Sequence, residues 1–234
     1  MTYVFLGLGA ILVLIFVSKR TAKVTLELAF LKAVASVCFI LTSLFAMVEN
    51  PDCPKIVGAL IAAGGVWGLL GDIALDLKYV FKSHEKEYLN AGFSSFGVGH
   101  IFYIAALYIN FGFNLKAFIG SIVAGLVCVG IVFIAKPIMK LDYRGFRNIT
   151  MIYMFILGYV YGLASGYAIF DYSLPALIFT IGFILFLASD IFLSGLYFGQ
   201  TEKERTSRPA IVINHLLYYA AQFTVAIALL FIKK

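Results

Sequence analysis

Two aspartates, Asp72 and Asp190, lie late in long apolar stretches of the chain and share a local pattern. Each begins an Asp-Ile-x-Leu run, and 28 and 25 residues later comes a His-x-x-Tyr-x-Ala-Ala run that begins at His100 and at His215. Ionisable groups inside a membrane are costly, and they face the protein interior or water. Two carboxyl groups in different environments can divide the work of acid and base between them. The pair is therefore a candidate for general acid–base catalysis.

The candidate residues share one depth in the sequence pattern. An α-helix rises 1.5 Å per residue, which places five candidates on the order of 8–17 Å from the predicted cytoplasmic ends of their helices. These five are Lys32, Asp72, His100, Asp190 and His215. Glu27 and Asp76 are shallower, and we expect them to be solvated near helix ends. One polar pocket, open to the cytoplasmic leaflet, accounts for this distribution.

Structural roles remain open for each of these groups. Lys32 can neutralise Asp72, or it can extend to the membrane surface. Either histidine can be a buried core residue that satisfies its own hydrogen bonds. The segment from Lys78 to Glu87 is charged, and we expect it to be a solvated loop.

Long apolar runs must position these side chains. The chain has 234 residues, of which 62% are hydrophobic and only 13% are charged, so it cannot cover a water-soluble surface. A membrane span needs about 20 mostly apolar residues. Eight windows meet this need: Thr2–Val17, Val24–Val48, Ile56–Leu77, Leu89–Asn110, Leu115–Ala135, Asn148–Phe170, Leu174–Tyr197 and Ala210–Ile232. We predict an all-α polytopic protein with a single membrane domain over residues 1–234, whose first window is a retained helix.

The basic residues alternate between the loops. Thirteen of the 18 lysines and arginines lie in the loops after the first, third, fifth and seventh windows. The positive-inside rule places these loops in the cytoplasm and both termini on the other side. This bias explains the net charge of +6 without a nucleic-acid partner. We expect the cell membrane in a bacterium, or the endoplasmic reticulum membrane in a eukaryote.

The repeated Asp and His patterns predict an internal duplication. Two parallel four-helix halves, about 1–112 and 113–234, follow from an even number of helices in each half. Gly64, Gly68 and Asp72 recur at i, i+4 and i+8, so they share one helix face. Gly158, Gly162 and Gly166 form a similar stripe in the sixth window. Such small-residue faces allow close helix contact, either within one chain or in a homodimer.

Several kinds of site are excluded by the sequence. It lacks the G-x-S-x-G motif of serine hydrolases, the H-E-x-x-H motif of zinc proteases and the phosphate-binding loop of nucleotide-binding proteins. Cys38, Cys53 and Cys128 have no metal-binding spacing. We expect neither a metal nor an organic cofactor.

Short motifs from residue 30 to residue 222 resemble the YhhN family, the family of the mammalian lysoplasmalogenases. They are Phe30-Leu31-Lys32-Ala33, Gly71-Asp72, Gly92 through Phe96 to His100 and Tyr103, Ser189-Asp190, and Tyr218-Tyr219-Ala220-Ala221-Gln222. The resemblance implies eight membrane helices and hydrolysis of the vinyl ether bond of lysoplasmalogen. It also implies Asp72 and Asp190 as the catalytic pair, acting on a lysophospholipid within membrane lipid.

The chemistry of a vinyl ether suits these residues. Protonation of its β-carbon gives an oxocarbenium ion, to which water adds, and two carboxyl groups serve a related cation in glycosidases. His100 is a third catalytic candidate. Lys32 or Arg208 is expected to hold the phosphate, and Tyr103, Tyr218, Ser189 and Gln222 to bind the glycerol or orient the acids. A proton-coupled transporter of lipid or of a small molecule is the alternative function.

Overall fold

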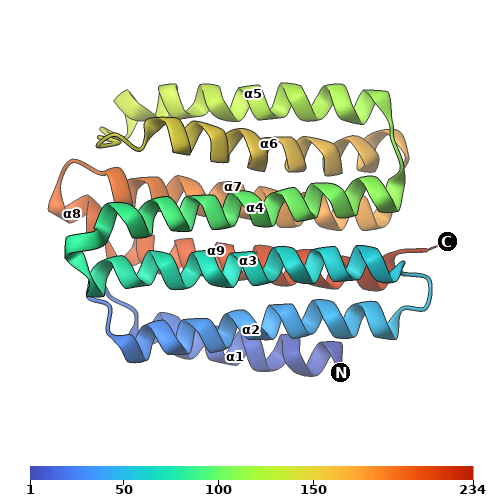
Figure 1. Ribbon diagram of the computed structural model, residues 1–234, viewed down its shortest axis with the longest axis horizontal. Helices are drawn as coiled ribbons and strands as arrows, with labels where there is room; N and C mark the ends of the chain where they lie inside the picture. Colours follow the sequence, from blue (N-terminus) through green and yellow to red (C-terminus); the bar gives the residue numbers. More distant parts are fainter. Residues whose placement is uncertain (234) are drawn as a thin grey trace.

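The computed structural model describes residues 1–233 as a bundle of antiparallel helices (Figure 1). Eight of its helical segments are long and apolar enough to cross a membrane. The principal helices are α1 (Thr2–Lys19), α2 (Leu26–Glu49), α3 (Lys55–Val80), α4 (Glu85–Phe111), α5 (Leu115–Ile138), α6 (Arg147–Phe170), α7 (Leu174–Phe198) and α9 (Arg208–Ala228). The prediction of an all-α polytopic membrane protein is confirmed, and the eight windows match these helices to within a few residues.

Three short elements were not predicted. A 3-10 turn, η1 (Lys82–His84), precedes α4, another, η2 (Leu229–Phe231), follows α9, and the single-turn helix α8 (Glu202–Arg205) lies between α7 and α9. Thr201 and Glu204 form a capping box around α8, in which each side chain accepts from the backbone N–H of the other residue.

Local sequence explains where several long helices begin and end. The side chains of Thr25, Asn114 and Ser173 each accept hydrogen bonds from backbone N–H groups in the first turn of α2, α5 and α7. The α4 helix ends at Gly112, whose φ of +75° is a conformation that favours glycine. The caps at Gly112, Asn114 and Ser173 lie at the end of the bundle that also holds both termini, whereas Thr25 lies at the opposite end.

Helices adjacent in the sequence pack as hairpins: α1 with α2, α3 with α4, α5 with α6, and α7 with α9. The α9 helix also contacts α1, α2 and α3, whereas α5 packs chiefly on α6 at one edge of the bundle (Figure 1). The loops after α1, α3, α5 and α7 gather at one end, which carries the 13 loop cations and is called the basic end below. Both termini lie at the opposite end.

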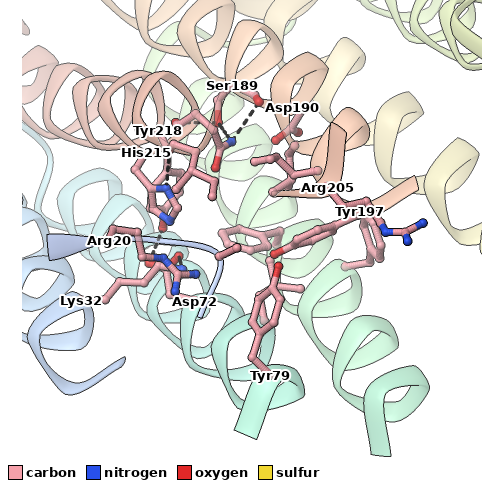
Figure 2. A pocket seen from close by; sticks show the side chains of 18 of the residues that line it. Arg20, Lys32, Asp72, Tyr79, Ser189, Asp190, Tyr197, Arg205, His215 and Tyr218 are labelled. Carbon is pink, nitrogen blue, oxygen red and sulfur yellow. Dashed lines mark hydrogen bonds and ion pairs between the residues drawn. The ribbon is translucent and has the colours of Figure 1, made fainter. Parts of the chain in front are cut away.

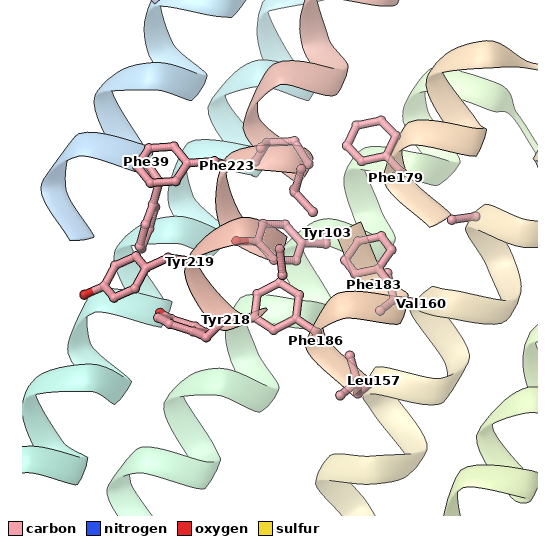
Figure 3. Close-up of a cluster of buried hydrophobic side chains, with 14 of the residues drawn as sticks. Phe39, Tyr103, Leu157, Val160, Phe179, Phe183, Phe186, Tyr218, Tyr219 and Phe223 are labelled. Atoms are coloured by element: carbon pink, nitrogen blue, oxygen red, sulfur yellow. The ribbon is translucent and has the colours of Figure 1, made fainter. Parts of the chain in front are cut away.

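Buried aromatic side chains form a cluster between α2, α4, α7 and α9 (Figure 3). Its members are Phe39, Tyr103, Phe179, Phe183, Phe186, Tyr218, Tyr219 and Phe223. Phe183 and Tyr219 are completely or almost completely buried, at 0% and 1% exposure. This cluster occupies the middle of the bundle.

The glycine stripe of α6 packs against α5 within the same chain. A Cβ atom added at Gly158 would lie 2.7 Å from Cys128 Sγ and 2.8 Å from the Ala124 carbonyl oxygen. At Gly162 and Gly166 an added Cβ would meet Ser121, Ala124 and Ala117 of α5 at similar distances. The close approach therefore accounts for this stripe without a dimer.

Gly158→Ala is expected to destabilise the protein by about 1–3 kcal/mol, because the Ala124 carbonyl cannot move without displacing the α5 backbone. The matched control is Gly130→Ala in α5, where an added Cβ meets nothing within 4 Å. Thermal unfolding of both purified variants in detergent measures the difference. Equal melting temperatures would contradict the close packing of α5 on α6.

Candidate functional site

A cavity that is partly open to the outside lies at the basic end of the bundle (Figure 2). Its wall is built from the α1–α2 loop, from α8, and from six of the long helices, α2, α3, α4, α6, α7 and α9. The polar lining residues are Arg20, Thr21, Lys32, Asp72, Tyr79, Tyr153, Ser189, Asp190, Tyr197, Arg205, Asn214, His215 and Tyr218. The cavity thus brings both aspartates of the sequence pattern to one space, with Asp72 and Asp190 on different sides of it in Figure 2.

Asp72 is a fully bonded carboxyl group on α3. Lys32 Nζ lies 3.1 Å from Asp72 Oδ1. The hydroxyl groups of Ser36 and Tyr218 donate to Asp72 Oδ2 at 2.8 and 2.7 Å. Of the two open interpretations of Lys32, the structure therefore supports neutralisation of Asp72, since Lys32 is only 5% exposed and does not extend to the surface.

Asp76 belongs to the same charge cluster, and the prediction that it is solvated was wrong. Its exposure is 1%. Arg20 Nη2 donates to Asp76 Oδ1 at 2.9 Å, and Lys32 Nζ lies 3.7 Å from the same oxygen. The α1–α2 loop carries Arg20 over the end of α3, so two buried cations balance the two buried carboxylates of Asp72 and Asp76.

Asp190 on α7 has a different environment. Tyr153 of α6 donates to Asp190 Oδ2 at 2.6 Å. Within residues 1–233, no Lys, Arg or His nitrogen lies within 4.0 Å of the Asp190 carboxyl group. The two aspartates of the repeated pattern therefore differ in charge compensation: a cation contacts Asp72, and a phenol contacts Asp190.

A chain of hydrogen bonds supports Asp72 from behind the cavity wall. Tyr103 donates to Gln222 Oε1 at 2.9 Å, Gln222 Nε2 donates to the Tyr218 hydroxyl at 3.2 Å, and Tyr218 donates to Asp72. Tyr218 lines the cavity, whereas Tyr103 and Gln222 do not. The latter two can orient Tyr218 and, through it, the carboxyl group.

His100 does not line the cavity, so the structure does not place this catalytic candidate beside the aspartates. Its Nδ1 is 2.7 Å from the Phe96 carbonyl oxygen, and its buried Nε2 has no partner in the described part of the chain. The Tyr153 and Phe186 rings pack edge-on against it. His215 does line the cavity; its Nδ1 is 2.7 Å from the Ile211 carbonyl oxygen.

Ser189 and Asn214 join α7 to α9 beside the cavity. Asn214 Nδ2 donates to the Ser189 carbonyl and hydroxyl oxygens, both at 2.9 Å, and Ser189 Oγ donates to the Asn214 carbonyl at 3.2 Å. These bonds hold the helix turn that carries Asp190. Asn214 had no distinguishing signal in the sequence other than its polarity within an apolar run.

The arginines that line the cavity are not Arg208, the one that was predicted to hold the phosphate. Arg208 is directed to the Ser18 carbonyl oxygen, 3.0 Å from Nη2, and does not line the cavity. Arg20 and Arg205 line it instead. Sequence reasoning counted both only as loop cations, because nothing in their local sequence separates them from the others.

Lys78 also departs from the prediction of a solvated loop. It is 5% exposed, and its Nζ lies 3.2 Å from the centre of the Tyr197 ring. Residues 81–87 are exposed as predicted, but they do not form a loop, because η1 covers Lys82–His84 and α4 begins at Glu85. Lys78 remains buried because α3 continues to Val80.

Comparison with the curated proteins and with the solved structures finds no match. The model of the YhhN family matches residues 4–229, which is nearly the whole chain. That match includes the eight long helices, apart from the first two residues of α1, and every residue of the cavity wall. The resemblance found in the short motifs is confirmed: the chain belongs to the YhhN family.

Proposed function

We propose that this protein is an intramembrane hydrolase that cleaves the vinyl ether bond of lysoplasmalogen. Its products would be a fatty aldehyde and glycerophosphoethanolamine or glycerophosphocholine. The observation that carries the proposal is the pair of aspartates at one cavity, of which Asp72 has a cationic partner and Asp190 does not. Family membership is consistent with this function.

The unequal environments support different roles for the two aspartates. A carboxylate at membrane depth needs a counter-charge, and Asp72 has one in Lys32. We therefore take Asp72 as the ionised base and Asp190 as the group that carries the proton. Tyr153 holds the Asp190 carboxyl group in place, as a positioning residue.

The reaction then balances with these two groups alone. Asp190 gives its proton to the β-carbon of the vinyl ether, whose π electrons form the new C–H bond and leave an oxocarbenium ion. Water adds to the carbon next to the ether oxygen and loses a proton to Asp72. As the hemiacetal collapses, Asp72 returns that proton to the ether oxygen while the C–O bond breaks. The Asp190 carboxylate takes the hydroxyl proton, and both groups are restored.

Arginine and lysine side chains in the cavity wall suit the phosphate of the substrate. Arg20, Lys32 and Arg205 all line the cavity, and a guanidinium group binds phosphate oxygens well because it presents several donors in one plane. Buried Nε and Nη1 of Arg20 have no hydrogen-bond partner in the described residues. A rotation of this side chain would present them to an anion in the cavity.

A transporter is less well supported by the same geometry. A carrier needs a route from the basic end to the opposite end, with polar groups along it. The aromatic cluster fills the middle of the bundle, where Phe183 and Phe186 are 0% and 1% exposed. The lysine, arginine, aspartate and histidine residues of the cavity come from the α1–α2 loop, from α8 and from the ends of the long helices nearest to them.

The decisive test is aldehyde release in heavy water. Purified wild-type protein in detergent, supplied with lysoplasmenylethanolamine in D₂O, is expected to give an aldehyde with one deuterium on the carbon next to the carbonyl. The matched control substrate is the saturated alkyl ether, which has no double bond to protonate and should not be cleaved. Absence of aldehyde from folded protein, with both ethanolamine and choline head groups, would rule the function out.

A further inference from the structure

We infer that a groove between α5 and α7 binds the hydrocarbon chain of a single-chain lipid, which enters it sideways from the membrane. This inference rests on the proposed function and specifies how the substrate lies at the site. The groove is partly open, and its empty space of about 330 Å³ includes the space at its mouth. It is lined by Ile131, Val132, Ala135, Met139, Tyr143, Thr150, Met154, Asp190, Ile191 and Ser194.

The groove runs from the outside of the bundle to Asp190. Ile131 of α5 and Ile191 of α7 are 39% and 49% exposed, on the lipid-facing side of these spans. Thr150 and Met154 of α6 are 4% and 8% exposed and lie at the inner end. The α5 helix packs chiefly on α6, so its other side remains available to a lipid chain.

A small cavity lies between the groove and the main cavity and shares wall residues with both. It shares Phe93, Tyr153 and Tyr197, among others, with the main cavity, and it shares Thr150, Met154 and Ser194 with the groove. Asp190 lines all three spaces. This carboxyl group therefore stands at the junction of a polar space and an apolar one.

The polar side chains of the groove already have partners. Thr150 Oγ1 donates to the Phe146 carbonyl at 2.9 Å, Ser194 Oγ to the Asp190 carbonyl at 2.8 Å, and the Tyr143 hydroxyl to the Val132 carbonyl at 2.9 Å. None of these hydroxyl groups needs a ligand to satisfy its donor. A hydrocarbon is the occupant that such a surface favours, since a polar ligand would lose its own hydrogen bonds there.

The order of the spaces matches the order of groups along the substrate. The phosphate and glycerol would lie beside Arg20 and Lys32, the vinyl ether beside Asp190, and the alkenyl chain in the groove. Sideways access keeps the chain in a hydrocarbon environment, so that its methylene groups are not transferred to water.

Ala135→Phe tests the groove, because the larger side chain would fill part of it. Ala135→Leu fills less of it and is less disruptive to folding. For Ala135→Phe, kcat/KM for a long alkenyl chain is expected to fall about tenfold or more, while that for a short chain stays unchanged. The matched control is Ile134→Phe, one residue earlier, where the side chain is 61% exposed to the outside. An unchanged preference for chain length in both Ala135 variants would overturn the inference.

Photocrosslinking provides a readout that does not depend on catalysis. Lysophosphatidylethanolamine with a diazirine in its chain is expected to label residues 131–139 and 190–198, and excess unmodified lipid should compete for the label. Ala135→Phe should reduce this labelling, and Ile134→Phe should not. Labelling that neither competitor nor Ala135→Phe reduces would overturn the groove. A protein that labels as expected but releases no aldehyde would contradict the proposed function and leave the groove supported.

Discussion

Purified Asp190→Asn protein is expected to release aldehyde from lysoplasmenylethanolamine at least about 10²-fold more slowly than wild type. The reason is that an amide cannot supply the proton that the β-carbon requires, and general acid catalysis typically contributes about 10²–10⁴-fold. Asparagine has nearly the same shape, and its oxygen can still accept the Tyr153 hydrogen bond. The loss should therefore appear in kcat with little change in stability.

Asp171→Asn is the matched control for this substitution. Asp171 follows α6 at the end of the bundle opposite the cavity, where it is exposed and accepts a hydrogen bond from Asn114 at 2.9 Å. The same chemical change there should leave aldehyde release unchanged. Full activity in folded Asp190→Asn protein would remove Asp190 from the role of acid.

The membrane fold could be predicted in detail because its physical signal is strong. Each span requires about 20 apolar residues, so the windows matched the helices to within a few residues. The single turn of α8 was not predicted, because it depends on a capping box at Thr201 and not on hydrophobicity. The shared depth of Lys32, Asp72, His100, Asp190 and His215 likewise predicted one polar cavity, and all of these except His100 line it.

Residues near helix ends were the ones that the sequence could not assign. Asp76 and Arg20 resemble solvated residues at the membrane surface, yet both are buried and bonded to each other. Their partnership depends on where the α1–α2 loop crosses α3, which is a tertiary contact without a local pattern. His100 shows the reverse difference. Its depth in the sequence pattern predicted a place at the cavity, but its side chain packs among aromatic rings and does not line the cavity.

The predicted duplication offers an explanation of how one repeated pattern yields two chemical roles. In each predicted half, the helix before the aspartate contributes a partner to it: Lys32 of α2 contacts Asp72, and Tyr153 of α6 contacts Asp190. A change from a cation to a phenol at that partner position would make one carboxyl group a base and the other an acid. The halves themselves remain a prediction.

Lys32→Met is expected to have the largest effect on stability, lowering the free energy of unfolding by about 3–5 kcal/mol. Removal of one member of a buried ion pair leaves the other charge uncompensated. Among residues 1–233, Lys32 is the only cation within 4.0 Å of Asp72. Unfolding by sodium dodecyl sulfate, followed by circular dichroism, measures the change. Lys116→Met is the control, because Lys116 is exposed and such substitutions usually stay within about 0.5 kcal/mol.

Adding Asp72→Asn to Lys32→Met should restore a substantial part of the lost stability, because the double variant no longer buries that unpaired charge. Neighbouring residues of this kind couple by about 0.5–3 kcal/mol in a double-mutant cycle. Losses that simply add would mean that Lys32 does not neutralise Asp72. The folded double variant also separates the structural role of Asp72 in the ion pair from its proposed role as the base. Since its charge balance is kept while its base is removed, we expect it to be stable and to release no aldehyde.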